Sequence, residues 1–168
     1  MSRMPVVRQI SWPAVLLQLA ALGGAVALGT YVTQISDGGA IGAAAYLSYS
    51  IGSRLLIARA HRRGMRFYRN QQYAAAIEAY QESYDFFARN TWIDQYRAIV
   101  MMSPSAVSYR EMALCNIAFC FSQLGNGAQA EAFYRRALDE FPSSGLAAAA
   151  LRMIDSAKQR PAEAVAAQ

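Results

Sequence analysis

The side chains that most often carry catalysis are scarce in this sequence and poorly spaced for it. The only histidine is His61, and the two cysteines, Cys115 and Cys120, lie five residues apart. This spacing matches neither a Cys-x-x-Cys redox pair nor half of a zinc site, and no metal-binding residues flank His61 at ligand spacing. A Cys115–His61 dyad requires the fold to bring the two residues together. We therefore expect no catalytic residue, no metal and no cofactor.

The remaining polar motifs are typical of surfaces and turns. Glu78 and Glu82 are four residues apart, so they share one face of a helix, where carboxylates are usually exposed. Gly125-Asn126-Gly127 lacks the Lys and the Ser or Thr of a phosphate-binding loop, and it is predicted to be a turn. The sequence thus favours a protein without enzymatic activity. An enzyme that uses Cys115 or the acidic residues is the alternative.

Positive charge is concentrated in the first part of the chain. Residues 1–70 contain eight Arg and one acidic residue, whereas residues 71–168 contain eight Lys or Arg and ten acidic residues. This asymmetry argues against a uniformly basic nucleic-acid-binding protein. Part of the charge forms an arginine cluster that could bind anionic lipid headgroups or nucleic acid, but its position just after an apolar segment favours a topology signal. The cluster consists of Arg54, Arg59, Arg62, Arg63 and Arg66.

Two apolar segments near the N-terminus predict a transmembrane hairpin. Residues 13–33 carry no charge, and about 20 apolar residues suffice for a helix to cross the hydrocarbon layer. Residues 40–58 carry only Arg54, whose side chain is expected to extend to the headgroups. Small residues recur at every fourth position and predict close packing of the two helices or, alternatively, a dimer contact. These residues are Ala21, Ala25 and Gly29 in the first segment and Ala44, Ser48 and Gly52 in the second.

The distribution of arginines predicts the orientation of the hairpin. Arg3 and Arg8 precede the first segment and the arginine cluster follows the second, whereas the connecting loop contains only Asp37. The positive-inside rule then places both termini in the cytoplasm. The alternative is a signal peptide cleaved near Ala25-Val26-Ala27. The apolar run continues to Val32, which is longer than usual for a signal peptide and favours a span.

After Arg69, apolar residues recur at helical spacing and no segment alternates as a strand would. From Glu111 the large and small residues follow a 34-residue unit, in which Ala118 and Ala130 allow two helices to touch. A unit that begins at Ile57 follows the same pattern with two departures. Its first helix is expected to continue the second span without a break, from about residue 40 to residue 70. The fold class is therefore all-α.

The two units begin 54 residues apart, which leaves 20 residues beyond one repeat. These extra residues predict one short helix capped by Asn90 or Thr91, and Ser103-Pro104 is expected to cap and start the next helix. Because two repeats are fewer than the three normally needed, the inserted helix is expected to pack over an incomplete core. A last helix, capped by Ser143 or Ser144 and ended by Pro161, is predicted to close the array.

These features resemble small bacterial inner-membrane proteins in which a two-span hairpin precedes tetratricopeptide repeats. The resemblance depends on the repeat pattern and on two stretches, Trp92-Ile93-Asp94-Gln95-Tyr96-Arg97 and Ser108-Tyr109-Arg110-Glu111-Met112-Ala113-Leu114-Cys115-Asn116-Ile117-Ala118-Phe119-Cys120. It implies a location in the bacterial inner membrane and a role in protein binding, and it names no ligand.

The resemblance also implies a binding surface, because the first helix of each tetratricopeptide unit lines a concave groove. Its soft Met and aromatic walls and its basic edge suit an extended or helical peptide with apolar anchors and one acid. In the alternative arrangement the inserted helix covers this groove. The residues at groove positions are His61, Met65, Tyr68, Arg69, Met112, Cys115, Phe119, Ser122 and Gln123.

The sequence therefore predicts four parts: a cytoplasmic N-terminal segment (1–12), a transmembrane hairpin (13–58), a cytoplasmic tetratricopeptide-like domain with an inserted helix and a C-terminal capping helix (59–160), and a flexible tail (161–168). The expected function is a membrane-anchored scaffold or adaptor that binds a protein or peptide, contacts membrane lipids and binds no nucleic acid. The alternative is a structural accessory subunit of a larger membrane complex, associated through its transmembrane helices.

Overall fold

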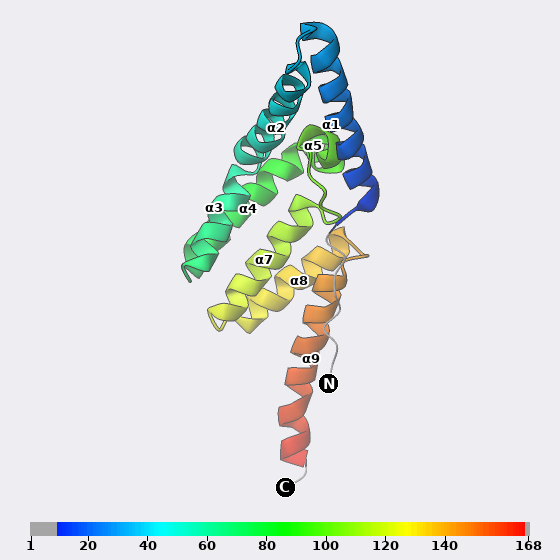
Figure 1. Ribbon diagram of the computed structural model, residues 1–168. Helices are drawn as coiled ribbons and strands as arrows, with labels where there is room; N and C mark the ends of the chain where they lie inside the picture. Colours follow the sequence, from blue (N-terminus) through cyan, green and yellow to red (C-terminus); the bar gives the residue numbers. More distant parts are fainter. Residues whose placement is uncertain (1–9, 167–168) are drawn as a thin grey trace.

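The computed structural model describes the backbone of residues 10–166 and the side chains of residues 10–159. Within this part the chain is all-α, with nine helices and a single isolated bridge between Ile10 and Ser105. Arg3, Arg8 and residues 167–168 lie outside the described residues. Figure 1 shows two long helices as a hairpin at one end and α9 at the other. The helices are α1 (Trp12–Thr33), α2 (Gly38–Ile57), α3 (Arg59–Arg69), α4 (Tyr73–Arg89), α5 (Thr91–Gln95), α6 (Arg97–Val100), α7 (Tyr109–Gln123), α8 (Gly127–Glu140) and α9 (Gly145–Ala166).

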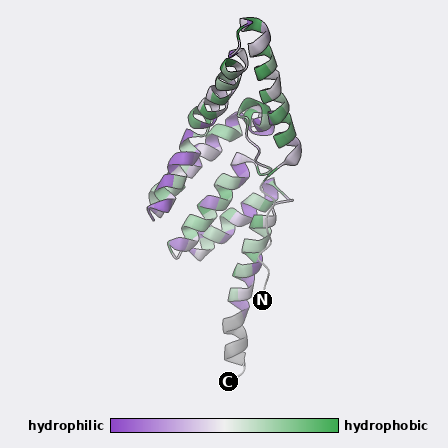
Figure 2. Ribbon diagram, viewed as in Figure 1, coloured by the Kyte–Doolittle hydropathy of each residue, from purple (hydrophilic) through white to green (hydrophobic). Residues whose placement is uncertain are grey.

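The hairpin of α1 and α2 exposes most of its apolar side chains. Both helices are long and apolar enough to cross a membrane. Leu16, Leu28 and Leu56 are largely exposed, and Figure 2 shows the hydrophobic colouring along both helices. A soluble domain rarely exposes so large a continuous apolar surface.

The two helices of the hairpin approach most closely through glycines. A Cβ atom at Gly42 would overlap the carbonyl oxygen of Ala25, and one at Gly29 would overlap the carbonyl oxygen of Gly38. The predicted stripe of Ala21, Ala25 and Gly29 does lie partly buried on α1. Glycine is needed here because the backbones themselves are in contact.

The predicted contact stripe on α2 is wrong. Ala44 and Ser48 are exposed, and a Cβ atom at Gly52 would meet nothing within 4 Å. Small residues occupy several faces of α2, so their spacing alone does not select the face that contacts α1. The face that contacts α1 is instead the one whose glycines allow the two backbones to approach most closely. The inner face of α2 consists of Gly38, Gly42, Tyr46 and Ser50.

Below this contact the two helices separate, and the short helix α5 lies between them (Figure 1). The short helix α6 contacts α1. The last cross-link within the hairpin is the Tyr46 hydroxyl, which donates to the carbonyl oxygen of Gln18 at 3.1 Å. One turn further, the Tyr49 hydroxyl donates instead to the carbonyl oxygen of Val100 at 2.9 Å. The inserted segment therefore packs at the base of the hairpin.

The expected unbroken helix over residues 40–70 is interrupted at Ala58. The ψ angle of Ala58 is 25°, which separates α2 from α3, although the Arg62 amide still bonds to the Ala58 carbonyl. Ala58 is buried in a cluster with Phe87, Ile93 and Met101. Contact with the inserted segment therefore accompanies the break, and such a contact is invisible in the local sequence.

The inserted segment forms two short helices, α5 and α6, where the sequence predicted one. Tyr96 separates them. Asn90 occupies the position before α5, but its side chain donates back to the carbonyl oxygen of Phe86 at 2.9 Å instead of capping α5.

The remaining helices pack in sequence order, α3 on α4, α4 on α7, α7 on α8 and α8 on α9. A Cβ atom at Gly64 would lie 2.7 Å from the Tyr80 ring, so glycine allows α3 to approach α4 closely. Ala118 and Ala130 are both fully buried. The predicted turn at Gly125-Asn126-Gly127 is confirmed, with a φ angle of +74° at Gly125.

The ends of α7 and α9 confirm one of three predicted helix boundaries. Ser144 caps α9 as predicted, because its Oγ accepts from the Ala147 amide at 3.3 Å. The expected start at Ser103 is wrong, since α7 begins at Tyr109 after the cap Ser108. The expected end at Pro161 is also wrong, because α9 continues to Ala166. Proline removes one helical hydrogen bond, and the Ala and Glu residues that follow it favour the helix.

We expect Gly42→Leu to lower the stability of the hairpin by about 1–3 kcal/mol, because a side chain at this position forces the two backbones apart. Unfolding in mixed micelles by titration with sodium dodecyl sulfate measures the change. Ala44→Leu is the matched control on the exposed face and is expected to change stability by less than about 0.5 kcal/mol. Equal losses in both variants would contradict this arrangement of the hairpin.

Candidate functional site

A cavity of about 490 Å³ lies between α3 and α7. The loop of residues 103–107 forms a third wall, and Ile10 and Leu146 contribute from the two outer segments of the described chain. This volume is within the range usual for small-molecule pockets and anchor-residue sites. The lining residues are Ile10, His61, Met65, Ser103, Pro104, Ser105, Val107, Glu111, Met112, Cys115, Asn116 and Leu146.

The structure brings four of the nine predicted groove residues together. His61, Met65, Met112 and Cys115 line the cavity. Tyr68 and Phe119 instead pack on each other at one side, with ring centroids 5.7 Å apart. The other predicted positions, Arg69, Ser122 and Gln123, are exposed near helix ends and do not line the cavity.

His61 is a buried, neutral residue in the wall of this cavity. It is 8% exposed, and its Nδ1 lies 3.4 Å from the hydroxyl of Ser83. The rings of Tyr80 and Tyr109 meet it edge-on, each at a centroid distance of 5.3 Å. Burial lowers the pKa of His61 from 6.5 to about 4, because desolvation disfavours the imidazolium ion. At neutral pH this residue supplies shape and a neutral polar group, not positive charge.

The two cysteines lack the properties of a catalytic nucleophile. Burial raises the pKa of Cys115 to about 12 and that of Cys120 to about 11, so both thiols are protonated at neutral pH. A reactive cysteine needs the opposite shift. Within the described part of the chain no hydrogen bond joins Cys115 to His61, and no group of three His, Cys, Asp or Glu residues is arranged to hold a metal ion.

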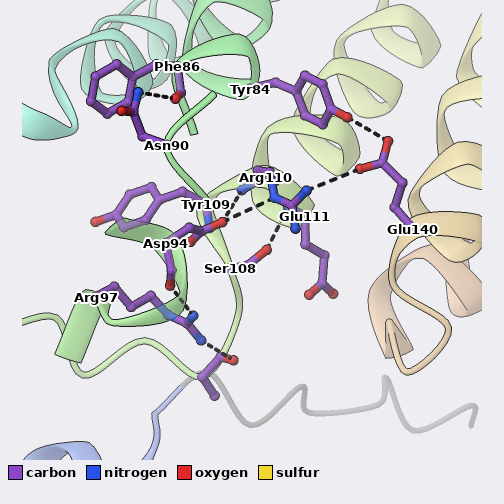
Figure 3. A network of polar contacts seen from close by, with 11 residues as sticks. Tyr84, Phe86, Asn90, Asp94, Arg97, Ser108, Tyr109, Arg110, Glu111 and Glu140 are labelled. Atoms are coloured by element: carbon purple, nitrogen blue, oxygen red, sulfur yellow. Dashed lines mark hydrogen bonds and ion pairs between the residues drawn. The ribbon is translucent and has the colours of Figure 1, made fainter. Parts of the chain in front are cut away.

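Asp94 positions the first turn of α7, and with it one wall of the cavity. Its carboxylate is 3% exposed and accepts hydrogen bonds from the backbone amides of Tyr109, at 2.8 Å, and Arg110, at 3.2 Å (Figure 3). These amides have no partner inside the helix, and a carboxylate is favourable at this end. Ser108 adds a third contact, since its Oγ accepts from the Glu111 amide at 3.0 Å.

Arg97 holds the loop that forms the third wall. Its guanidinium donates to the carbonyl oxygens of Ser105, at 3.0 Å, and Ala106, at 2.8 Å. It also donates to the carbonyl oxygen of Asp94 at 2.7 Å (Figure 3). These bonds satisfy loop carbonyls that no secondary structure satisfies. The two charged residues of the inserted segment therefore organise the loop and α7 together.

Sequence reasoning missed the roles of Asp94, Arg97 and the loop of residues 103–107. One local signal was available, because Ser108-Tyr109-Arg110-Glu111 has the Ser-x-x-Glu spacing that marks a helix start. Recognition of that start identifies residues 103–107 as a loop. The contacts of Asp94 and Arg97 carry no comparable signal, since their partners are mostly backbone groups further along the chain.

A second hollow, of about 310 Å³, lies where α2 ends and α3 begins. Four residues of the arginine cluster line it together with Leu55. Arg63 also pairs with Glu82, and both side chains are about half exposed, so the pair contributes little stability. Arg54 does not line the hollow, because its side chain bonds to the carbonyl oxygens of Met101 and Met102. The arginines in the hollow are Arg59, Arg62, Arg63 and Arg66.

No family model, no curated protein and no solved structure matches the chain. Similarity therefore does not identify tetratricopeptide repeats in it. The structural description is an all-helical chain, over the described residues, with two apolar N-terminal helices packed as a hairpin.

The burial of His61 predicts an acid-sensitive structure. The unfolded chain binds a proton near pH 6.5 and the folded chain only near pH 4, so stability is retained above pH 6.5 and falls as the pH drops toward 4. The loss attributable to His61 is about 3 kcal/mol at the acid end of this range. Denaturant unfolding between pH 7 and pH 4 measures it.

His61→Phe is the matched control, because it retains an aromatic ring and removes the titration. Its stability is expected to fall less over the same pH range. The single histidine also gives a direct readout by NMR, since its imidazole C–H shift should stay constant from pH 8 to pH 5. An ordinary titration near pH 6.5 would contradict the burial of this ring.

Proposed function

We propose that this protein is a membrane-anchored adaptor that holds a segment of a partner protein in the cavity between α3 and α7. The observation that carries this proposal is the cavity itself, which is tied by backbone contacts to an apolar hairpin long enough to span a membrane. A preformed cavity with mostly apolar walls and few polar groups is the usual form of a recognition site.

The walls of the cavity define the chemistry of its occupant. Met65, Met112 and Val107 offer an apolar surface, and methionine adapts well to varied side chains. Glu111 and Asn116 add acceptors, and His61 is neutral there. A peptide segment with an apolar anchor and a neighbouring amide or amino donor suits these walls better than the acid expected from the sequence.

The resemblance to tetratricopeptide proteins supports the same function. In such repeats the first helix of each pair lines the groove, and α3 and α7 hold these positions before α4 and α8. Under this proposal α9 is the capping helix, and Leu146 at its start borders the cavity.

The proposed location is the inner membrane of a bacterium, with the cavity on the cytoplasmic side. Four arginines follow α2 directly, whereas the loop between the spans carries Asp37 and no basic residue. The positive-inside rule assigns the arginine side to the cytoplasm. A partner held in the cavity is then kept close to the membrane surface.

Photo-crosslinking in native membranes tests the adaptor function. A photoreactive amino acid at Met65 or Met112 should capture a partner, and Leu146→Trp should lower capture about tenfold, which corresponds to about 1.4 kcal/mol of lost affinity. Leu124→Trp is the matched control, since Leu124 is exposed at the far end of α7 and outside the cavity. Capture that is insensitive to Leu146→Trp would contradict the proposal.

A second candidate function is that of an accessory subunit within a larger membrane complex. It is favoured by the exposed face of α2 that carries Ala44 and Ser48, where another helix could approach closely. Because this face does not contact α1, substitutions there leave the hairpin intact.

Replacement of Ala44, Ser48 and Gly52 by Leu distinguishes the two functions. If the protein is an accessory subunit, these changes should release it from its complex in mild detergent, as seen by native gel electrophoresis. If the adaptor function is correct, the triple variant should retain its partner, while Leu146→Trp should lose it. If the unchanged protein is a homodimer through this face, the triple variant should form a detergent-solubilised particle of half the mass.

A further inference from the structure

The inserted segment exposes a face that is apolar and uncharged. Trp92, Tyr96 and Ile99 follow one another at helical spacing and are 55%, 52% and 54% exposed. The only charged residues between positions 91 and 101 are Asp94 and Arg97, and both bond to backbone groups, Asp94 to the start of α7 and Arg97 to the loop that precedes it. Exposed aromatic residues without neighbouring charges are unusual on a surface that faces water.

This face lies at the level where both spans end. The Tyr49 hydroxyl and the Arg54 guanidinium, both on the last turns of α2, bond to carbonyl oxygens at the end of the inserted segment. On the other side, the Ser11 amide donates to the Pro104 carbonyl at 2.8 Å, just before α1 begins at Trp12. Figure 1 shows α5 between the lower parts of α1 and α2. A bilayer that covers the spans to their ends therefore reaches α5 and α6.

We propose that α5 and α6 lie in the interfacial layer of the cytoplasmic leaflet, with Trp92, Tyr96 and Ile99 at the boundary between headgroups and acyl chains. This proposal rests on the membrane-spanning hairpin of the proposed function. Trp and Tyr prefer this layer because their rings are apolar and their edges form hydrogen bonds. The occupant is a lipid surface because the face is uncharged and continues the exposed apolar surface of both spans.

An interfacial position also explains why side chains of α2 donate hydrogen bonds to backbone carbonyls of this segment. Its outward residues gain from lipid only while its inward backbone groups stay satisfied, because a free carbonyl is costly near the hydrocarbon. Arg54 and Tyr49 satisfy three such carbonyls, those of Val100, Met101 and Met102. The segment thus acts as a third membrane contact and sets the depth of the cavity below the bilayer.

Tryptophan fluorescence tests this position directly. The chain has two tryptophans, so Trp12→Phe leaves Trp92 as the only reporter in the full-length protein. The variant is reconstituted into vesicles of phosphatidylcholine and phosphatidylglycerol, with or without bromine on the upper part of the acyl chains. We expect blue-shifted emission that is lost in brominated vesicles and is insensitive to acrylamide in the water.

Two matched reporters, both in a Trp12→Phe, Trp92→Phe background, separate this proposal from the spanning hairpin. Leu19→Trp reports on the exposed face of α1, and Leu124→Trp reports on the far end of α7. Emission from position 19 should be quenched by the brominated lipid, and emission from position 124 only by acrylamide. Circular dichroism checks that each variant retains its helix content.

The outcomes have distinct meanings. Quenching by brominated lipid at positions 19 and 92 supports the interfacial position. Quenching at position 19, with Trp92 open to acrylamide and unaffected by the lipid, overturns it and leaves the hairpin in place; the face would then be free for a protein partner. If neither position is quenched by lipid, the spanning hairpin and this proposal both fail.

Discussion

The arrangement of this protein depends on the contact between Arg54 and the end of the inserted segment. Arg54 is the only charged residue in α2, and its guanidinium bonds to the carbonyl oxygens of Met101, at 3.2 Å, and Met102. Met102 has a φ angle of +47°, a backbone conformation that non-glycine residues rarely adopt. A charge near an apolar layer and a free carbonyl are each costly, and their pairing removes both costs. Together with the Tyr49–Val100 and Ser11–Pro104 hydrogen bonds, this contact joins the hairpin to the helical domain.

From Arg54 a series of polar contacts leads to the cavity. Arg54 holds the chain at Met101 and Met102, Arg97 holds the following loop, and Asp94 holds the first turn of α7. Most of these contacts involve backbone groups, so they fix the course of the chain and not merely the packing of side chains. The position of the cavity relative to the hairpin is therefore determined by hydrogen bonds in the inserted segment.

The chemistry of the cavity agrees with recognition. Its imidazole is neutral because it is buried, and its thiol is protonated for the same reason. General base catalysis and nucleophilic attack both need a group whose pKa lies close to the working pH. Apolar walls with a few fixed acceptors instead select a segment of suitable shape and hydrogen-bonding capacity. The proposed function, an adaptor anchored beside the membrane, uses all of these features.

The sequence by itself determined the helical class, the two apolar helices and the turn at residues 125–127. These features follow from local composition, since a long uncharged run, a helical period and a glycine turn act within a few residues. The resemblance to tetratricopeptide units also placed His61, Met65, Met112 and Cys115 on one surface, and these four residues line the cavity. Only the tertiary structure decided which face of α2 contacts α1, that Arg54 bonds to the inserted segment, and that residues 103–107 complete the cavity. These outcomes depend on contacts between residues distant in the chain, where backbone approach and unpaired carbonyls outweigh any local pattern.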